Sequence, residues 1–523
     1  MSSGMAETDE KPISLANWIG FFSMGVGVFM AVLDIQIVAS SLHEIQAGLS
    51  ATQDEIAWVQ TSYLIAEVII IPLSGWLAKV LSTRILFTLS CGGFTLASIA
   101  CAFAWNLPAM IIFRAVQGFM GGAMIPVTFV VIYEMFPKRL HGPMTIVLGL
   151  IVTIAPTIGP VMGGYLTDAY GWQSLFLINL LPGLVVCFLV LKTVDIDQPE
   201  WQLLKKIDFV GIVLIALFLG SLQFVLEEGV REQWFESRLI TGLTIVAAVS
   251  FVAMLIWELT IEHPIIELSA FKNGNFAIGC AYSFVLGVGL YTITYLTPIY
   301  LASVNGLNSL QIGYYLMVVG LFQLVSAFIA GPLEDKIDLR LMLALGFGLF
   351  ALGSWMNSQL TAEAGYWEFF WPQAVRGMAL MLCFLPINTL SLGLLPVEEV
   401  KNASGLYNLM RNLGGAIGLA VANTEIINLT KTHYAAIRES VSATRYSVQT
   451  ALEVLSQNLT QHGLPDPQAG ALKQITALAL REAEVMTFNN LFEAIGFLFF
   501  ISLLVAPFLR KVDPEKAAEL PMD

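Results

Sequence analysis

Three charged side chains lie inside long apolar stretches of the chain, where a charge needs a function or a partner. Asp34 stands in AVLDIQIV, Glu67 in YLIAEVIII and Arg114 in IIFRAVQG. Within a membrane such residues are rare and usually mark ion or substrate pathways. A carboxylate shielded from water can take up and release a proton when its surroundings change. These residues therefore predict proton transfer, and no nucleophile–base or metal-ligand pattern accompanies them to suggest an enzyme.

Asp34 and Arg114 are expected at matching depths. At about 1.5 Å of rise per residue, Asp34 lies roughly 10 Å from the outer end of a helix expected at 16–41, and Arg114 lies equally deep in a helix expected at 107–136. A neighbouring Arg favours the charged carboxylate, whereas burial favours the neutral one. Asp34 is therefore a predicted proton-coupling residue that Arg114 tunes. The alternative is a structural ion pair that only orients two helices.

Glu67 is expected deeper than Asp34. It lies about fourteen residues, or roughly 21 Å, from the outer end of a helix expected at 53–79, which is past the middle of the membrane. A Glu that faced lipid would cost several kcal/mol, so it should face a cavity or a partner. Glu67 is predicted as a second proton-coupling site or as an anchor for a cationic group on the substrate. The alternative is a permanently protonated Glu that bonds a neighbouring helix.

Two arginines, Arg376 and Arg411, lie at middle depth in the second half of the chain and could favour anionic substrates. Arg376 could instead pair with Glu493. Aromatic and Met side chains on the expected cavity helices suit broad apolar substrates, although such residues more often serve ordinary packing. Besides the two arginines, the predicted substrate-cavity residues are Met30, Tyr63, Met124, Tyr291, Tyr295, Tyr315 and Phe384.

The composition places these residues in a membrane. Of the 523 residues, 57% are hydrophobic and 12% are charged, whereas a soluble domain is about 25% charged. The net charge of −14 argues against a nucleic-acid partner. The five cysteines all fall in apolar stretches without a CxxC pair, which favours packing over disulfides or a metal site. Because no GxxxxGK phosphate loop is present, we expect an ion gradient as the energy source and no bound cofactor.

The elements that must position these residues are long apolar helices. A spanning helix needs about 20 apolar residues, and fourteen stretches qualify, which predicts an all-α membrane protein. Lys and Arg concentrate in the short loops on the side of the N-terminus, so both termini are expected in the cytoplasm. The expected spans are 16–41, 53–79, 84–105, 107–136, 140–169, 172–192, 207–226, 238–257, 273–302, 309–334, 339–359, 366–395, 400–429 and 485–510.

The chain repeats its features at half-length. GWLAKVLSTR from Gly75 matches GPLEDKIDLR from Gly331, and AVQG at 115–118 matches AVRG at 374–377. Two such halves usually enclose a central substrate path. We therefore expect a six-helix bundle at 1–192, a linker with two additional helices at 193–272, and a second six-helix bundle at 273–523. The alternative is a continuous fourteen-helix bundle without symmetry.

Several motifs, in order along nearly the whole chain, carry a family resemblance. They are LDIQIVASSLHEI, WVQTSYLIAEVIIIPLSGWLAK, RAVQGFMGG, APTIGPVMGGYLTD, IWELTIEHPIIELSAFKNGNFAIGC and LMRNLGGAIG. The chain resembles the major facilitator superfamily, in its fourteen-helix drug:proton antiporter branch, and is most similar to EmrB-like multidrug efflux proteins. The resemblance implies two bundles of the major facilitator fold, a proton gradient as the energy source and, for Arg411, a structural or gating role.

The same resemblance assigns a packing motif and two gating loops. Gly lets helices pack closely and Pro bends a helix axis, and in this family such a motif is typical of exporters. Lys79 and Ser82 replace the usual Asp and Gly of the first gating loop, so a charge lock must use other partners in the first half, with Arg84 and Glu134 as candidates. The motif is Pro156, Gly159, Pro160, Gly163 and Gly164, and the gating residues are Gly75, Lys79, Arg84, Glu134, Gly331, Asp335 and Arg340.

The segment 430–484 is too polar to span the membrane and is expected as two amphipathic helices, at 433–459 and 467–484. Relatives work with a periplasmic adaptor and an outer-membrane channel, so this segment could dock such a partner or could merely cap the outer mouth. The predicted function is proton-coupled efflux of hydrophobic or amphipathic compounds across the cell inner membrane. The alternatives are a dedicated exporter of a fatty acid, siderophore or other metabolite, and, in a different class, a non-transporting membrane receptor.

Overall fold

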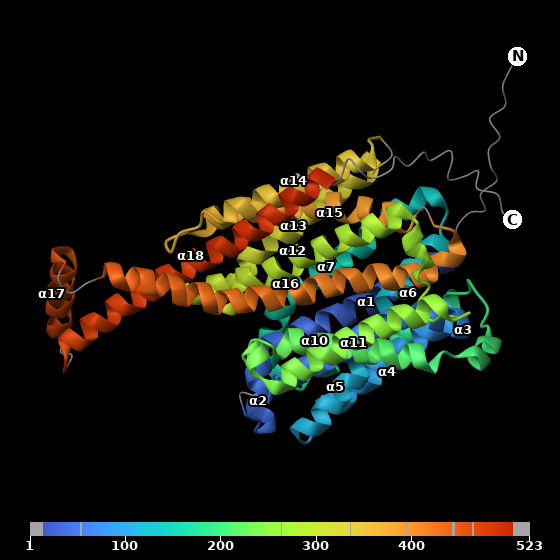
Figure 1. The fold of residues 1–523 in the computed structure, drawn as a ribbon, viewed down its shortest axis with the longest axis horizontal. Coiled ribbons are helices and arrows are strands. Elements are labelled where there is room, and N and C mark those ends of the chain that lie inside the picture. Colours follow the sequence, from blue (N-terminus) through green and yellow to red (C-terminus); the bar gives the residue numbers. More distant parts are fainter. Residues whose placement is uncertain are drawn as a thin grey trace, which may run out of the picture.

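A computed structural model describes residues 14–52, 55–262, 264–334, 336–393, 395–441, 445–462 and 465–505, and every regular element within these ranges is a helix. Figure 1 shows the helices as two inclined groups, the first half in blue and the second half in yellow and orange. We call the end where α1 begins and α18 ends the Leu15 end, and the opposite end the α17 end.

Two helices of the first half are interrupted. The span expected at 107–136 is divided after Gly121, and the span expected at 172–192 is divided at Ile178 and Asn179. The helices of this half are α1 (Leu15–Ser40), α2 (Leu42–Leu49), α3 (Trp58–Leu81), α4 (Thr83–Ala102), α5 (Leu107–Gly121), α6 (Met124–Met135), α7 (Lys138–Tyr170), α8 (Ser174–Leu177) and α9 (Leu180–Thr193).

The additional pair of helices lies beside the first half. Asp208 caps the first helix of the pair and accepts a hydrogen bond from Trp257 of the second at 2.9 Å, which fastens the two together. The linker elements are η1 (Trp201–Lys206), α10 (Phe209–Glu228), η2 (Trp234–Glu236), α11 (Arg238–Thr260) and η3 (Leu268–Lys272).

The second half contains the longest helix. Its elements are α12 (Gly274–Ser303), α13 (Ser309–Glu334), α14 (Leu339–Asn357), α15 (Tyr366–Ser391), α16 (Val397–Ser440), α17 (Tyr446–Gln461) and α18 (Pro467–Val505). Helix α16 packs against α12 and α18 in its own half and against α3 and α6 of the first half, while α13 packs against α7. These contacts, α3 with α16 and α7 with α13, form the two seams between the halves.

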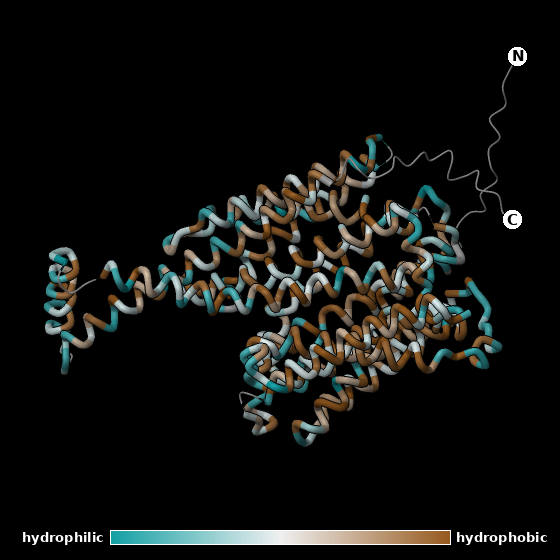
Figure 2. The backbone as a smooth tube through the Cα atoms, viewed as in Figure 1, coloured by the Kyte–Doolittle hydropathy of each residue, from teal (hydrophilic) through white to brown (hydrophobic). Residues whose placement is uncertain are grey.

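Thirteen stretches of the described residues are long and apolar enough to cross a membrane. The fourteenth expected span, 400–429, lies within α16, which is not among the thirteen. Protein surrounds much of α16, so polar side chains on it can face other helices instead of lipid. Figure 2 shows apolar residues, in brown, along the middle of the helices and hydrophilic residues, in teal, at both ends and on α17.

The polar segment 430–484 is largely helical, but the bounds expected at 433–459 and 467–484 differ from those of the structure. The first expected helix is divided, because α16 continues to Ser440 and α17 begins at Tyr446, and the second is the start of α18. Helix α16 has 44 residues and α18 has 39, so at about 1.5 Å per residue they measure roughly 66 and 58 Å, about twice the thickness of a bilayer core. The sequence 419–440 contains no Gly or Pro, so no helix-breaking residue ends α16 at the membrane surface. Both helices project beyond the bundle and carry α17 at their tips (Figure 1).

Candidate functional site

Asp34 of α1 is the centre of a buried polar network in the first half. Its side chain is fully buried, and its Oδ2 accepts a hydrogen bond from Arg114 Nη1 of α5 at 2.5 Å. Its Oδ1 accepts from Gln117 Nε2 at 2.9 Å and from Asn179 Nδ2 at 3.0 Å. Asn179 stands in the interruption between α8 and α9, so this break turns an amide toward the carboxylate.

Arg114 is held from three directions. Its Nη1 also donates to Gln117 at 2.8 Å, its Nε donates to the carbonyl of Val59 at 3.1 Å, and the ring of Tyr63 lies 4.3 Å from its guanidinium carbon. The matched depth of Asp34 and Arg114 expected from the sequence is thus found in the structure. All three donors favour the charged carboxylate, so a rearrangement of this network would favour the uptake of a proton.

Glu67 lies nearer the α17 end than its expected depth. Helix α3 begins at Trp58 and not at 53, because 55–57 form a turn, so Glu67 is nine residues into the helix, or about 14 Å. Glu67 therefore lies before the midpoint of this 24-residue helix, and the expectation counted from residue 53 places it too far along the helix. The side chain is buried and packs against the α5–α6 interruption at Gly122.

Glu67 faces both halves of the molecule. It interacts electrostatically with Asp34 and Arg114 of the first half and with Tyr291 of α12 in the second half. Among the described residues, no side chain forms a hydrogen bond or an ion pair with its carboxylate. Glu67 is therefore the acidic group that stands between the network around Asp34 and the second half.

Arg411 of α16 lies on the second-half side of the same region. It is buried, donates to Asn408 Oδ1 at 2.5 Å and lies 5.5 Å from the ring of Phe384. Within the described ranges, its Nε and Nη1 have no hydrogen-bond partner and no carboxylate forms an ion pair with it. Next to it, Tyr291 donates to Asn412 at 3.3 Å. This arrangement leaves a buried positive charge opposite Glu67.

The other predicted cavity residues are dispersed. Phe384 packs against Phe129 of the first half, with ring centroids 6.3 Å apart, whereas Tyr315 packs against Tyr366 and Phe369 within the second half. Tyr295 is 37% exposed, and Met30 and Met124 are buried in the core. Arg376 lies inside the second half, away from both seams.

A cluster of charges closes the Leu15 end. Lys401 of α16 lies 2.6 Å from Asp197 and 3.4 Å from Glu134, and Asp197 also accepts from the backbone and hydroxyl of Thr83 at the start of α4. Nearby, Tyr133 donates to Asn388 of α15 at 2.7 Å. These contacts join the first half and its linker to the second half.

The first gating loop uses the linker for its charged partners. Lys79 pairs with Glu267 at 2.9 Å, and Arg84 pairs with Asp195 at 3.4 Å. Of the two residues predicted to replace the missing Asp, Glu134 contacts the second half and Arg84 contacts the linker. Sequence reasoning missed Lys401, Asp197 and Glu267, since nothing local to them indicates a partner so far along the chain.

The α3–α16 seam is tightest beside this charge cluster. A Cβ added to Gly75 would lie 2.5 Å from the backbone oxygen of Lys401, and one added to Gly405 would lie 3.0 Å from that of Ile71. Only glycine permits backbones to approach so closely. In the second gating loop, Gly331 lies near Ile146, Arg340 bonds Asp338 at 2.9 Å, and Asp335 lies outside the described residues.

The predicted packing motif lies in α7, which continues as a helix through Pro156 and Pro160. A Cβ on Gly159 would meet Gln36 of α1 at 2.4 Å, and one on Gly163 would meet Ser40 at 2.4 Å, so these glycines seat α1 against α7. A Cβ on Gly164 would meet nothing within 4 Å. The motif therefore fixes the helix that carries Asp34.

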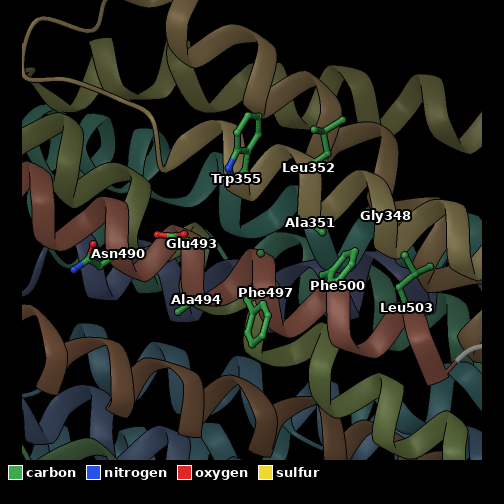
Figure 3. Close-up of a pocket in the computed structure, with 11 residues that line it drawn as sticks. Gly348, Ala351, Leu352, Trp355, Asn490, Glu493, Ala494, Phe497, Phe500 and Leu503 are labelled. Carbon is green, nitrogen blue, oxygen red and sulfur yellow. The ribbon is translucent and has the colours of Figure 1, made fainter.

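Glu493 lies in a groove on the outside of the bundle. The groove, about 810 Å³ in volume, runs between α14 and α18 and is lined mainly by apolar side chains, with Glu493, Asn490 and Trp355 at its polar part (Figure 3). Arg376 lines a different, interior cavity, and among the described residues the two form no ion pair. The suggested pairing of Arg376 with Glu493 is absent from this structure.

Comparisons with known proteins agree with the helical architecture. A profile of the Major Facilitator Superfamily matches residues 21–419. The colistin resistance protein EmrB of Acinetobacter baumannii is 39% identical over 497 residues, which are 94% of this chain and 96% of that protein. The multidrug export protein EmrB of Escherichia coli K12 is 31% identical with the same coverage. The fatty acid resistance protein FarB of Neisseria gonorrhoeae is 30% identical over 94% of this chain and 95% of its own.

Solved structures show the same arrangement of helices. The proton:xylose symporter XylE, bound to 6-bromo-6-deoxy-D-glucose, superposes with a TM-score of 0.60 over 96% of this chain and 97% of its own, at 13% identity. The human organic anion transporter MFSD10 gives a TM-score of 0.55 at 12% identity, over 92% and 99% of the two chains. At such identity the likeness concerns the fold alone, and the helical fold expected from the sequence is confirmed.

Proposed function

This chain belongs to the Major Facilitator Superfamily, and we propose that it is a proton-coupled antiporter that exports hydrophobic and amphipathic compounds, drugs among them. The expected resemblance to EmrB-like efflux proteins is confirmed by relatives named for multidrug export and for colistin resistance. The observation that carries proton coupling is the buried network around Asp34. A carboxylate inside an apolar bundle that is held by an Arg and two amides is suited to exchange a proton when those partners move.

The steps follow from the placement of the charges. A proton that reaches Asp34 would remove the ionic partner of Arg114, which would free the guanidinium to turn toward Glu67 at the interface of the halves. Glu67 would then be neutralised by Arg114, by a proton of its own or by a cationic substrate. Each of these changes the electrostatic interaction of Glu67 with Tyr291 and with Arg411, which lies next to Tyr291 in the second half. Protonation near Asp34 would in this way bias how the two halves rock against each other.

The orientation in the proposal places both termini in the cytoplasm and the Leu15 end inside the cell inner membrane. The charge cluster at Lys401 then closes the cytoplasmic side in this state. The extended α16, α17 and α18 project outward, toward the space where a periplasmic adaptor and an outer-membrane channel would stand. Their length, roughly twice the bilayer core, supports a docking role over a simple cap at the mouth.

A second candidate is the export of a carboxylate-bearing metabolite such as a fatty acid. Arg411 favours it, because this buried guanidinium keeps two nitrogens without a partner among the described residues. A substrate carboxylate could supply the missing acceptors. FarB, a relative named for fatty acid resistance, is consistent with this alternative.

Both candidates are tested by substrate-driven proton movement. The full chain, reconstituted in liposomes containing a pH-sensitive dye, is given tetraphenylphosphonium or oleate. We expect proton release from the wild type with at least one of these substrates, and loss of the signal in Asp34→Asn and Glu67→Gln. Glu493→Gln is the matched control, since it removes a membrane-level carboxylate that lies outside the bundle. Normal proton flux in both Asp34→Asn and Glu67→Gln would refute the assignment, and the response to oleate alone would select the second candidate.

A further inference from the structure

The second half contains a small interior cavity that the transport proposal does not use. It has a volume of about 40 Å³ and lies among α12, α13, α14 and α15, enclosed within one half. Its polar lining consists of Thr294 and Thr297 of α12 with Gln373 and Arg376 of α15, and the remaining lining is apolar. No acidic side chain lines it.

Arg376 is a buried charge without a counter-charge in this cavity. It is 5% exposed, and Gln373 is fully buried. Arg376 Nη2 donates to Gln373 Oε1, while Arg376 Nε and Gln373 Nε2 find no acceptor within the described part of the chain. A buried cation that lacks a partner is strongly destabilising. The cavity therefore presents two free N–H donors and one uncompensated positive charge.

The acids on the surrounding helices are already used elsewhere. The sequences of α12 and α14 contain no Asp or Glu, α13 ends at Glu334, and α15 contains Glu368. Glu334 accepts from Thr389 at 2.8 Å, near the Leu15 end, and Glu368 accepts from the backbone of Gly365 at 3.0 Å, at the start of α15. Neither lines the cavity, so no carboxylate among the described residues supplies a counter-charge to the guanidinium of Arg376.

The internal repeat shows what the cavity lacks. AVQG at 115–118 and AVRG at 374–377 are offset by 259 positions, so Gln117 corresponds to Arg376 and Arg114 corresponds to Gln373. Each half thus keeps one Arg and one Gln three residues apart and bonded to each other, with their order exchanged. In the first half this pair binds the carboxylate of Asp34 through Arg114 Nη1 and Gln117 Nε2. In the second half Arg376 Nε and Gln373 Nε2 have no acceptor among the described residues, and both side chains line the cavity.

We propose that this cavity binds a monoatomic anion, chloride under ordinary conditions, which takes the place that the carboxylate of Asp34 occupies in the first half. Arg376 Nε and Gln373 Nε2 donate to the ion, and the guanidinium supplies the compensating charge. The cavity has room for a chloride or bromide ion. We expect it to select these compact ions over sulfate and gluconate, because two N–H donors and one positive charge suit a small monovalent anion. The ion is a structural counter-charge and not the exported substrate.

Chloride is the probe for the test. The purified full-length protein, in nanodiscs of zwitterionic lipid, is heated in chloride, bromide, sulfate or gluconate salts at equal ionic strength. We expect Tm to rise with chloride and bromide only, and to rise with the logarithm of their concentration once it exceeds Kd, because a ligand that binds only the folded state stabilises it by RT ln(1 + [L]/Kd). Broadening of the ³⁵Cl resonance by the protein, relieved by bromide, gives an independent measure of binding.

Three variants locate the site. Gln373→Glu places a carboxylate beside Arg376, as Asp34 stands beside Arg114, and should make the protein stable without chloride and abolish the chloride shift. Arg376→Gln should also abolish it, whereas Arg411→Gln, which removes another buried Arg, should retain it. Equal Tm in all salts for the wild type would overturn the proposal, since water would then fill the cavity. A full chloride shift in Gln373→Glu, or its loss in Arg411→Gln alone, would overturn it as well.

Discussion

The ammonium of Lys401 lies 2.6 Å from the carboxylate of Asp197, although the two residues are separated by 204 positions in the chain. Lys401 stands at the start of α16 in the second half, and Asp197 stands in the linker, where it also bonds Thr83 at the start of α4. Both side chains are largely buried, at 11% and 15% exposed. This contact ties the helix that follows the first gating loop to the seam-forming helix of the other half.

Loss of the ammonium should loosen the closure of the Leu15 end. Lys401→Gln removes a charged hydrogen bond worth about 1.5–3 kcal/mol, which corresponds to a shift of roughly 10- to 150-fold in the ratio of closed to open molecules. Spin labels at Lys138 of α7 and Leu341 of α14, both exposed near this end, should report a larger population at long distance. Lys192→Gln on α9 is the control, because Lys192 only covers the ring of Phe188. An unchanged distance distribution in Lys401→Gln would contradict the assigned lock.

A methyl group at Gly75 should act on the same closure by sterics. In Gly75→Ala the new Cβ would lie 2.5 Å from the backbone oxygen of Lys401, so α3 and α16 must separate. Overpacking of this kind costs about 1–3 kcal/mol, and the same pair of spin labels should show a shift toward the open state. Gly348→Ala meets open space and should leave the distances unchanged. Identical distance distributions in Gly75→Ala and Gly348→Ala would show that the α3–α16 seam accommodates the added methyl group without opening.

Replacement of Arg114 by Lys should not preserve its function, despite the conserved charge. The guanidinium donates in separate directions to Val59, Asp34 and Gln117, and a single ammonium nitrogen cannot reach all three. Breaking a buried charged network costs about 3–5 kcal/mol, so Arg114→Lys should lower Tm clearly and abolish substrate-driven proton flux. Arg231→Lys is the control and should change Tm little, because the side chain of Arg231, which pairs with Glu228, is partly exposed. Wild-type proton flux in Arg114→Lys would mean that only the charge matters.

The ion pair of Lys79 with Glu267 should contribute little to stability. Its side chains are 25% and 35% exposed, and such pairs are worth about 0–1 kcal/mol. We expect Lys79→Gln and Glu267→Gln to change Tm by small and nearly additive amounts in a double-mutant cycle. A coupling energy well above about 1 kcal/mol would show that Lys79 replaces the usual acidic residue as a true lock.

The sequence predicted those parts of the site that depend on helix geometry. Asp34 and Arg114 were expected at one depth because the rise of a helix converts position into distance, and they do meet. The expected position of Glu67 along its helix was too far from the outer end because the helix was counted from 53, whereas 55–57 form a turn and α3 begins at Trp58. Asn179 and Gln117 carry no charge, so nothing in an apolar stretch marks them as partners of Asp34.

The sequence could not predict contacts between distant segments. The pairs of Lys401 with Asp197 and of Lys79 with Glu267 depend on how the linker folds back along the first half. The continuity of α16 and α18 was also missed. The change from apolar to polar residues resembles a helix end, although the backbone hydrogen bonds of a helix do not depend on that change.

The additional helices α10 and α11 are fastened to the first half at both of their ends. Thr61 of α3 donates to Glu228 of α10 at 2.8 Å near the α17 end, and Glu267 holds Lys79 at the Leu15 end. Trp234 of η2 donates to Thr424 of α16 in the second half at 3.1 Å. In the rocking motion that we propose, α10 and α11 would move with the first half, against which α10 packs, and would make it the wider of the two bodies. We expect lateral pressure in the bilayer to act unequally on two such bodies, so that lipid packing would influence the balance between the two states.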